Sequence, residues 1–454
     1  MLFFRTLFFY MVFSLCAVSQ GLTLNVSESL DLRKAFGKAM ENNPLILQAR
    51  AAKDKARANV DKSVSAFFPR LDLESGYIRS NNPVTSFSSK LNQAGFKADD
   101  FALNNLNHPD FLNEWQSRLV LTQPLFNQGR EYIAYKTSVL KRKISDLSFK
   151  STSEAVLFMV EQAYCQALLA KDNVGVLEAM YRTAVAHEKL SQERYKTGLV
   201  LKSDVLSARV RKASTEKQLY QARMNLRVAM ATLNRTMGIN QQKQWTLVPV
   251  NNEKMVEGNL PLWIDRAKRF RPEFLAVKNE LHIAKYQHRK AMARFLPSFN
   301  LKGIYETDRK DLFDKGGDSW TFMATMSINL FNSFADKASV SAAKFETEQK
   351  LAKLRDVKAS IELDVRKAYY RFRTAKQQLR VATKALGQAI ESQRILQRRY
   401  ENGLALMVEL LSADAAVFET RLAKARSRFD ARIAWSALKW KSGILGRDLI
   451  GSYP

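Results

Sequence analysis

The chain has 454 residues, of which 26% are charged, and its formal net charge is +28. Only two residues are cysteines, and one of them lies in the N-terminal apolar run, which excludes an intramolecular disulfide framework in the mature protein. Beyond that run no uninterrupted apolar stretch is long enough for a membrane-spanning helix.

The positive charge alone would suggest a nucleic-acid partner. However, the lysines and arginines are interleaved with acidic residues, and the longest basic run, 141–143, has only three members. Such a pattern is typical of solvated helix faces. Nucleic acid is therefore not an expected partner, and a basic nucleic-acid-binding coiled coil is the most distant alternative.

Residues 1–19 predict a secretory signal peptide. They contain one positive charge, a short apolar run and a small-residue exit, with expected cleavage after Ser19. Lipidation at Cys16 is a weaker alternative, because a bulky residue precedes it where small residues are usual. The mature chain keeps one cysteine, Cys165, which is expected to pack as a small apolar residue.

The first half of the chain predicts helices on either side of two strands. Asn43 followed by Pro44 is typical of a helix start, since Asn caps the first turn and Pro fits its first position. Two runs in which polar and apolar residues alternate have the period of a half-exposed strand. In chain order we expect helices near 30–40 and 44–66, a strand near 70–80, a polar loop over 81–113, a strand near 115–125, and helices over 130–195 and from 199 to 238.

The second half repeats this order. Arg271-Pro272 takes the place of Asn43-Pro44, and in both halves the strands begin after a Pro-terminated helix and end at Leu-Phe-Asn. So many matches in order predict an internal duplication, with a first repeat over residues 20–250 and a second over 251–454. The elements expected here are strands near 298–307 and 319–331, a long helix over 335–400 and a last helix that ends near Gly443.

Each repeat contains a helix–helix reversal with the pattern Arg-Tyr-x-x-Gly-Leu, followed by an acid and Ser-Ala. Gly198 and Gly403 supply the backbone freedom that a tight reversal needs. Asp204 and Glu409 lie in the first turn of the next helix, where negative charge is favourable. Each long helix of roughly 66 residues would span roughly 100 Å, about the combined length of the two shorter helices beside it. We therefore expect a long rod with a reversal at its tip, present twice.

The alternation along the strands indicates which surroundings they face. An apolar face and a polar face over about ten residues are the signature of a membrane β-barrel strand. Tyr77, Trp115, Tyr305 and Trp320 lie near the loop ends of the strands, where an aromatic belt at the membrane interface is expected. The alternative is a sandwich strand that faces a protein core. In the fourth strand the apolar face consists of Trp320, Phe322, Ala324, Met326, Ile328 and Leu330.

Four strands cannot close a barrel, and an open sheet edge is not tolerated in lipid. If the strands cross a membrane, several chains must combine them. The sequence therefore predicts an oligomer of α+β class, mostly α, in which long coiled-coil-like helices and a shared barrel belong to one assembly.

Over nearly its whole mature length the chain resembles the TolC-like outer-membrane factors of Gram-negative bacteria. The resemblance is carried by the two Pro-terminated helix–strand junctions, the two Leu-Phe-Asn sequences, and the tips Tyr-Lys-Thr-Gly-Leu-Val and Tyr-Glu-Asn-Gly-Leu-Ala. It implies a homotrimer that pools four strands per chain into a twelve-stranded outer-membrane barrel, with a long α-barrel in the periplasm. It also implies an exit duct that docks onto a periplasmic adaptor (membrane fusion) protein and an inner-membrane RND or ABC transporter.

The resemblance assigns the tips around Gly198 and Gly403 to the gate and to the adaptor-docking surface. By position, Asp204 and Glu409 match the acidic residues of the family tips. Two positions depart from the family pattern: Ser412 stands where some members have Asp, and the residue at 405, an alanine, stands where some have a latch Arg. These departures put a latch of the family kind in doubt.

No enzyme chemistry is expected. The histidines have no helical ligand spacing, and no cysteine or acid cluster completes a metal site. The chain has neither a Gly-rich phosphate loop nor a nucleophile elbow, so we expect no cofactor and no metal. The main alternative to an exit duct is a soluble periplasmic helical scaffold or adaptor without a channel, and the cargo stays open. The four histidines are His108, His187, His282 and His288.

Overall fold

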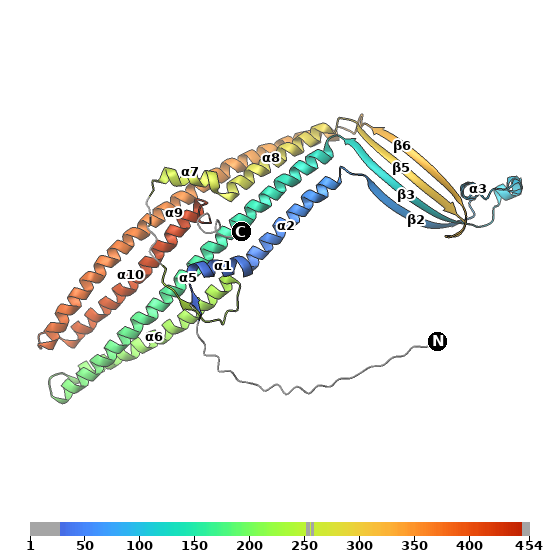
Figure 1. The fold of residues 1–454 in the computed structure, drawn as a ribbon. Helices are drawn as coiled ribbons and strands as arrows, with labels where there is room; N and C mark the ends of the chain where they lie inside the picture. Colours follow the sequence, from blue (N-terminus) through green and yellow to red (C-terminus); the bar gives the residue numbers. More distant parts are fainter. Residues whose placement is uncertain (1–27, 251–254, 256–257, 447–454) are drawn as a thin grey trace, which may run out of the picture.

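The computed structural model describes residues 28–250, 255 and 258–446. The molecule is elongated, with a four-stranded sheet at one end and both helix–helix reversals at the other (Figure 1). The predicted signal peptide over 1–19 and the alternative lipidation site Cys16 lie outside the described residues.

The helices form two series with the same order and nearly the same lengths. The first series is α1 (Leu32–Asn42), α2 (Pro44–Ser65), α5 (Arg130–Lys196) and α6 (Lys202–Met237), and the second is α7 (Leu260–Phe270), α8 (Pro272–Ala293), α9 (Ala335–Glu401) and α10 (Met407–Lys441). α5 and α9 have 67 residues each, which corresponds to about 100 Å. α2 and α6 pack along α5, and α8 and α10 pack along α9 (Figure 1).

Contacts of α8 and α10 with α5 join the two series side by side. α7, the counterpart of α1, is absent from the predicted elements. The predicted repeat boundary between residues 250 and 251 lies beside residues outside the described part of the chain and stays a prediction.

The strands form one antiparallel sheet in the order β2-β3-β5-β6, so β3 and β5 join the two halves of the chain. The strands are β2 (Arg70–Ser80), β3 (Leu112–Asn127), β5 (Ser298–Arg309) and β6 (Gly317–Ser327). The prediction that the fourth strand runs to residue 331 was wrong by four residues. Beyond Ser327 the side chains of Asn329 and Asn332 donate to the Asp336 carboxylate at 2.9 and 2.7 Å. This segment is therefore bonded to the first turn of α9 and does not continue the strand.

The segment between β2 and β3 contains helices that the predicted polar loop over 81–113 did not include. It contains α3 (Pro83–Asn92), a short 3-10 helix (Ala98–Phe101) and α4 (Leu103–Asn107). The Asn82 carboxamide caps α3 by accepting from the backbone N–H of Val84 at 3.1 Å. The Ser89 hydroxyl donates to the Glu114 carboxylate at 2.7 Å, which fastens α3 onto β3.

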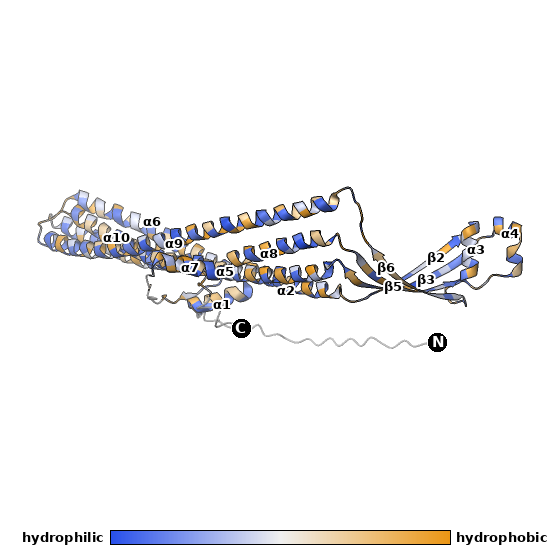
Figure 2. Cartoon of the chain, turned by 90° about the horizontal axis from the view of Figure 1, so that it is seen from above, coloured by the Kyte–Doolittle hydropathy of each residue, from blue (hydrophilic) through white to orange (hydrophobic). Residues whose placement is uncertain are grey.

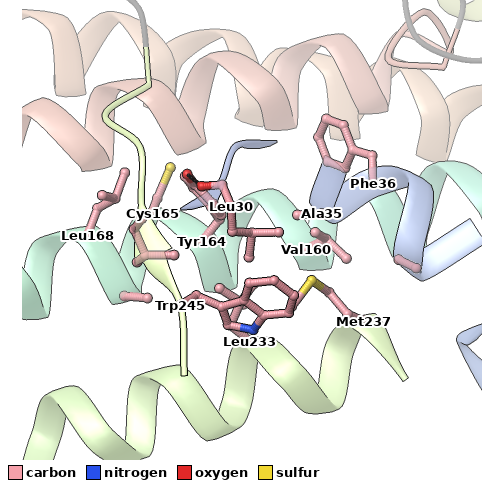
Figure 3. Packing of buried hydrophobic residues seen from close by; sticks show 14 of the residues in the cluster. Leu30, Ala35, Phe36, Val160, Tyr164, Cys165, Leu168, Leu233, Met237 and Trp245 are labelled. Carbon is pink, nitrogen blue, oxygen red and sulfur yellow. Dashed lines mark hydrogen bonds between the residues drawn. The ribbon is translucent and has the colours of Figure 1, made fainter. Parts of the chain in front are cut away.

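A hydrophobic core lies midway along the helices, where a two-stranded parallel sheet covers α5 and α6. The sheet pairs β1 (Ser29–Leu30) with β4 (Thr246–Leu247), and neither strand is among the predicted elements. The Tyr164 hydroxyl lies 2.7 Å from the carbonyl oxygen of Leu30 (Figure 3). It also lies 2.7 Å from the carbonyl oxygen of Val248, and the two contacts fix the small sheet on α5. Cys165 is fully buried as a small apolar residue, and burial raises the pKa of its thiol to about 12.

A second core occupies the equivalent place in the other half. There the ring of Trp263 from α7 packs edge-on against the ring of Trp435 from α10, with centroids 5.5 Å apart, and both lie beside the buried Phe372 of α9. The two cores hold the shorter helices against the long ones.

Glu154 of α5 is a buried carboxyl that destabilises the folded chain at neutral pH. It is 1% exposed, its Oε1 has no hydrogen-bond partner among the described residues, and Lys150 Nζ lies 3.9 Å away. Burial raises the pKa of this carboxyl from 4.5 to about 7. Between these pH values the unfolded chain has lost the proton while the folded chain keeps it, so the free energy of unfolding falls as pH rises.

We therefore expect Glu154→Gln to raise the melting temperature at pH 8 and to leave it nearly unchanged at pH 4. The gain in the free energy of unfolding at pH 8 has an upper bound of about 3 kcal/mol, from the shift of the pKa. Thermal unfolding at both pH values measures it, with the exposed Glu193→Gln on the same helix as control. Equal effects of Glu154→Gln at pH 4 and pH 8 would contradict the assignment.

Candidate functional site

The four strands place apolar and polar side chains on opposite faces of the sheet. The register pairs Leu73 with Leu119, Leu119 with Tyr305, and Tyr305 with Trp320, so a row of apolar side chains crosses all four strands. Leu73 is 74% exposed and Trp320 is 65% exposed, as expected for a face that contacts lipid. The exposed large apolar residues of this face are Leu71, Leu73, Tyr77, Leu119, Leu121, Phe299, Leu301, Trp320, Phe322 and Met326.

The opposite face of the sheet is mostly polar. The Glu306 carboxylate accepts from Arg118 Nε at 2.8 Å and from Gln116 Nε2 at 2.9 Å. The same Gln116 nitrogen lies 3.2 Å from Asp308 Oδ1. This network links β3 to β5 and therefore joins the two halves of the chain across a surface suited to water.

The aromatic residues predicted for a membrane interface lie on the apolar face. The rings of Tyr77 and Trp115 have centroids 5.3 Å apart, and those of Tyr305 and Trp320 are 4.6 Å apart. Each pair is a direct cross-strand pair of neighbouring strands. Their role at the lipid headgroups stays a prediction.

Exposed phenylalanines gather at the other end of the strands, where each strand meets a helix. Phe68 is 62% exposed, Phe331 72% and Phe334 70%. The rings of Phe331 and Phe334 pack edge to face at 5.5 Å. These phenylalanines belong to Phe67-Phe68-Pro69 and to the segment that contains the second Leu-Phe-Asn, at the junctions of helices and strands. Aromatic residues repeated beside a strand end are also the signal for a second interface belt, which the sequence prediction did not include.

The sheet has two open edges. β2 and β6 each pair with a single neighbour among the described strands, so no described strand pairs with the outer backbone groups of either. In lipid each such group costs several kcal/mol, because no water can replace the missing hydrogen bond. A second copy that pairs with each edge removes this cost.

At the opposite end of the molecule, the reversals follow the predicted chemistry. Gly198 and Gly403 adopt φ angles of +75° and +72°, which favour glycine. The Asp204 carboxylate accepts from the backbone N–H of Leu201 at 3.3 Å, and the Glu409 carboxylate accepts from that of Leu406 at 2.9 Å. Both acids therefore cap the helices in which they lie.

Ser412 is also bound within its own helix, because its hydroxyl donates to the carbonyl of Val408 at 2.8 Å. The tips carry exposed leucines that the sequence interpretation left out, although Gly-Leu recurs in both reversals. They give each tip an apolar surface beside its acid. The exposed fractions are 74% for Leu199, 72% for Leu201, 68% for Leu404 and 67% for Leu406.

The positive charge is concentrated rather than interleaved with acids on part of α9. Between Asp364 and Glu391 there are seven lysines and arginines and no acid. All seven side chains are exposed in the single chain, so the predicted even mixture of charges was wrong for this segment. The seven are Arg366, Lys367, Arg371, Arg373, Lys376, Arg380 and Lys384.

The described residues contain neither a metal-binding cluster nor a helix that could span a membrane. No group of three or more His, Cys, Asp or Glu side chains there could hold a metal ion. No helix in this part of the chain is long and apolar enough to cross a membrane, and polar residues interrupt every long helix (Figure 2).

The model of the outer membrane efflux protein family matches residues 35–239 and 263–443, one segment in each half of the chain. The chain belongs to the outer membrane efflux protein family. The two matched segments begin within α1 and within α7, and together they contain the strands of the four-stranded sheet, the long helices and both tips.

Relatives and solved structures agree with this membership. The chain is 24% identical over 424 residues to the alkaline protease secretion protein AprF of Pseudomonas aeruginosa, covering 92% of this chain and 85% of the relative. It is 20% identical to the outer membrane protein TolC of Escherichia coli, over 95% of this chain and 86% of the relative. The fold matches that of CusC with a TM-score of 0.77 at 18% identity, over 92% of this chain and 93% of that chain. The Campylobacter jejuni CmeC channel matches with a TM-score of 0.75 at 18% identity, over 91% and 86%.

The predicted family, fold class and function are therefore confirmed. The protein is an outer-membrane efflux channel that extends into the periplasm, and it is a transport protein rather than an enzyme. Membership of this family implies a trimeric channel that works with an inner-membrane transporter and an adaptor.

Proposed function

We propose that three copies of the chain close their four-stranded sheets into one barrel of twelve strands, with β6 of one copy paired to β2 of the next. The observation that supports this is a sheet with a lipid-type face, a polar face and two unpaired edges. The polar network around Arg118 and Glu306 then faces the water-filled interior.

The long helices continue this passage as a periplasmic duct. α5 and α9 have the length to carry it about 100 Å from the barrel. Energy comes from an inner-membrane transporter of the RND or ABC class, so the channel itself conducts passively. The alternative of a soluble periplasmic scaffold does not fit a chain of the outer membrane.

The tips form the periplasmic gate and the docking surface for an adaptor. Gly198 and Gly403 shape the reversals, while Asp204, Glu409 and Ser412 lie beside them at the starts of α6 and α10. Exposed leucines next to acidic residues offer a partner both apolar area and charge.

The assembly is tested by purification in a neutral detergent and by current measurements across planar lipid bilayers. We expect a stable trimer with β-sheet circular dichroism and a discrete conductance. A monomer that stays soluble without detergent and carries no current would contradict the proposed duct.

We expect Glu409→Lys to reduce export roughly tenfold while the trimer stays folded. Removal of the acid from the start of α10 lowers the stability of the folded chain by only about 0.3–1 kcal/mol. Reversal of the charge at the docking surface also weakens the association with the adaptor, and a tenfold loss of affinity corresponds to about 1.4 kcal/mol. Growth in the presence of a toxic compound exported through this channel measures the effect, with the exposed Glu419→Lys on the same helix as control. Unchanged export would leave Glu409 as a helix cap alone.

A further inference from the structure

A partly buried polar contact joins the two helix–helix hairpins near their tips. In it, Nε2 of His187 in α5 lies 2.7 Å from Oδ2 of Asp414 in α10. Nε2 of Gln393 in α9 donates to Oδ1 of the same carboxylate at 2.6 Å. Asp414 is 5% exposed, and no lysine or arginine of the described chain forms an ion pair with it. The carboxylate depends on these two partners, because a buried charge without partners is costly.

The contact lies about two helical turns from the ends of the helices that form the tips. His187 precedes the last residue of α5, Lys196, by nine residues, and Asp414 follows the first residue of α10, Met407, by seven. At 1.5 Å per residue, the contact is about 10–14 Å from the helix ends.

A weaker contact between the hairpins lies closer to the tips. The Arg194 guanidinium of α5 stands 4.7 Å from the ring centroid of Tyr400 in α9, and its Nη1 lies 3.5 Å from the carbonyl oxygen of Tyr400. Tyr400 is buried with Met407 and Leu410 in a small apolar cluster beside Leu190. The hairpins are therefore joined at the tips by one apolar cluster, one cation–π contact and the His187 contact.

We propose that the contact among His187, Asp414 and Gln393 is the latch that holds hairpin α9–α10 against hairpin α5–α6 and so limits the width of the entrance. The inference rests on the proposed function as an exit duct. The bonds that Asp204, Glu409 and Ser412 form in the single chain lie within their own helices and do not join the two hairpins. Ala405 has no polar side chain.

Single-channel currents of the full trimer in planar bilayers test the latch. We expect His187→Leu to increase the ratio of open to closed time roughly tenfold, because it removes one charge-assisted hydrogen bond from a buried site. His187→Gln can still donate to Asp414 and should behave as the wild type. This rescue separates a polar latch from simple packing.

Glu188→Gln is the matched control. Glu188 is the next residue of α5 and forms ion pairs with Arg209 at 3.3 Å and Lys212 at 3.0 Å, both in α6 of the same hairpin. Its loss breaks contacts at the same height but not between the hairpins. We expect the open fraction to stay that of the wild type.

The outcomes separate this inference from the proposed function. If the His187→Leu trimer has wild-type currents, the latch is wrong and the duct stands. If the wild type itself gives neither trimer nor current, the proposed duct is wrong. If His187→Leu does not assemble, the double variant His187→Leu with Asp414→Leu decides, since it leaves no buried charge. Frequent opening of that variant supports the latch, and wild-type gating overturns it.

Discussion

Replacing Ala324 by Arg is expected to abolish insertion of the trimer into the outer membrane. Ala324 lies in β6 opposite Leu301, on the apolar face between the exposed Phe322 and Met326. An arginine on the lipid face near the bilayer midplane costs about 2–4 kcal/mol, so three copies cost about 6–12 kcal/mol per trimer. Trimer bands on unheated denaturing gels of the outer-membrane fraction measure the loss.

The control for this prediction is the next residue along the same strand. Thr325 faces Asn300 on the polar side of the sheet, so Thr325→Arg should leave the trimer in the membrane. Normal assembly of both variants would show that this face does not contact lipid. Loss of both would indicate that edge pairing of β6, rather than the face of the side chain, decides assembly.

Gly238→Ala is expected to lower the stability of the folded chain by about 2–5 kcal/mol, from strain in the backbone together with steric overlap. Gly238 ends α6 with a φ angle of +73°, and an added Cβ would overlap the backbone carbonyl of Asn42. The neighbouring Asn43 side chain caps α2 through Leu45 N at 2.8 Å and donates to the carbonyl of Thr236 at 2.7 Å. The added methyl group would therefore push the end of α6 away from the α1–α2 connection. Thermal unfolding of the trimer measures the loss of stability.

Gly387→Ala is the matched control for this substitution. Gly387 lies in the interior of α9, where an added Cβ meets nothing within 4 Å. Alanine is the better helix former by about 1 kcal/mol, so this variant should be slightly more stable than the wild type. A Gly238→Ala variant as stable as Gly387→Ala would contradict the close approach at Asn42.

Features that depend on local pattern were predictable. The reversals at Gly198 and Gly403 rest on glycine chemistry within a few residues, and the long helices rest on runs without proline. The two faces of β6 follow from the alternation along the strand, which is interrupted on the polar face by Met323. These features can be predicted from the sequence because residues close together in the chain determine them.

Elements held by distant partners were not predictable. β1 and β4 have two residues each, and their pairing depends on Tyr164, a residue of the long α5 helix. The end of β6 was misplaced because Asn329 continues the alternation but bonds to Asp336 of the following helix. α3 was missed because its cap, Asn82, lies in a segment dominated by polar residues.

The sequence by itself determined the duplication, the two reversals and a strand set with an apolar face. The duplication follows from a repeated order of motifs, the reversals from glycine chemistry and the apolar face from alternation along the strands. The tertiary structure alone decided that β3 pairs with β5 and that His187 meets Asp414, 227 residues away. It also showed that Asp204 and Glu409 cap their own helices. Contacts of this kind depend on how the two halves pack against each other, which no local pattern of residues encodes.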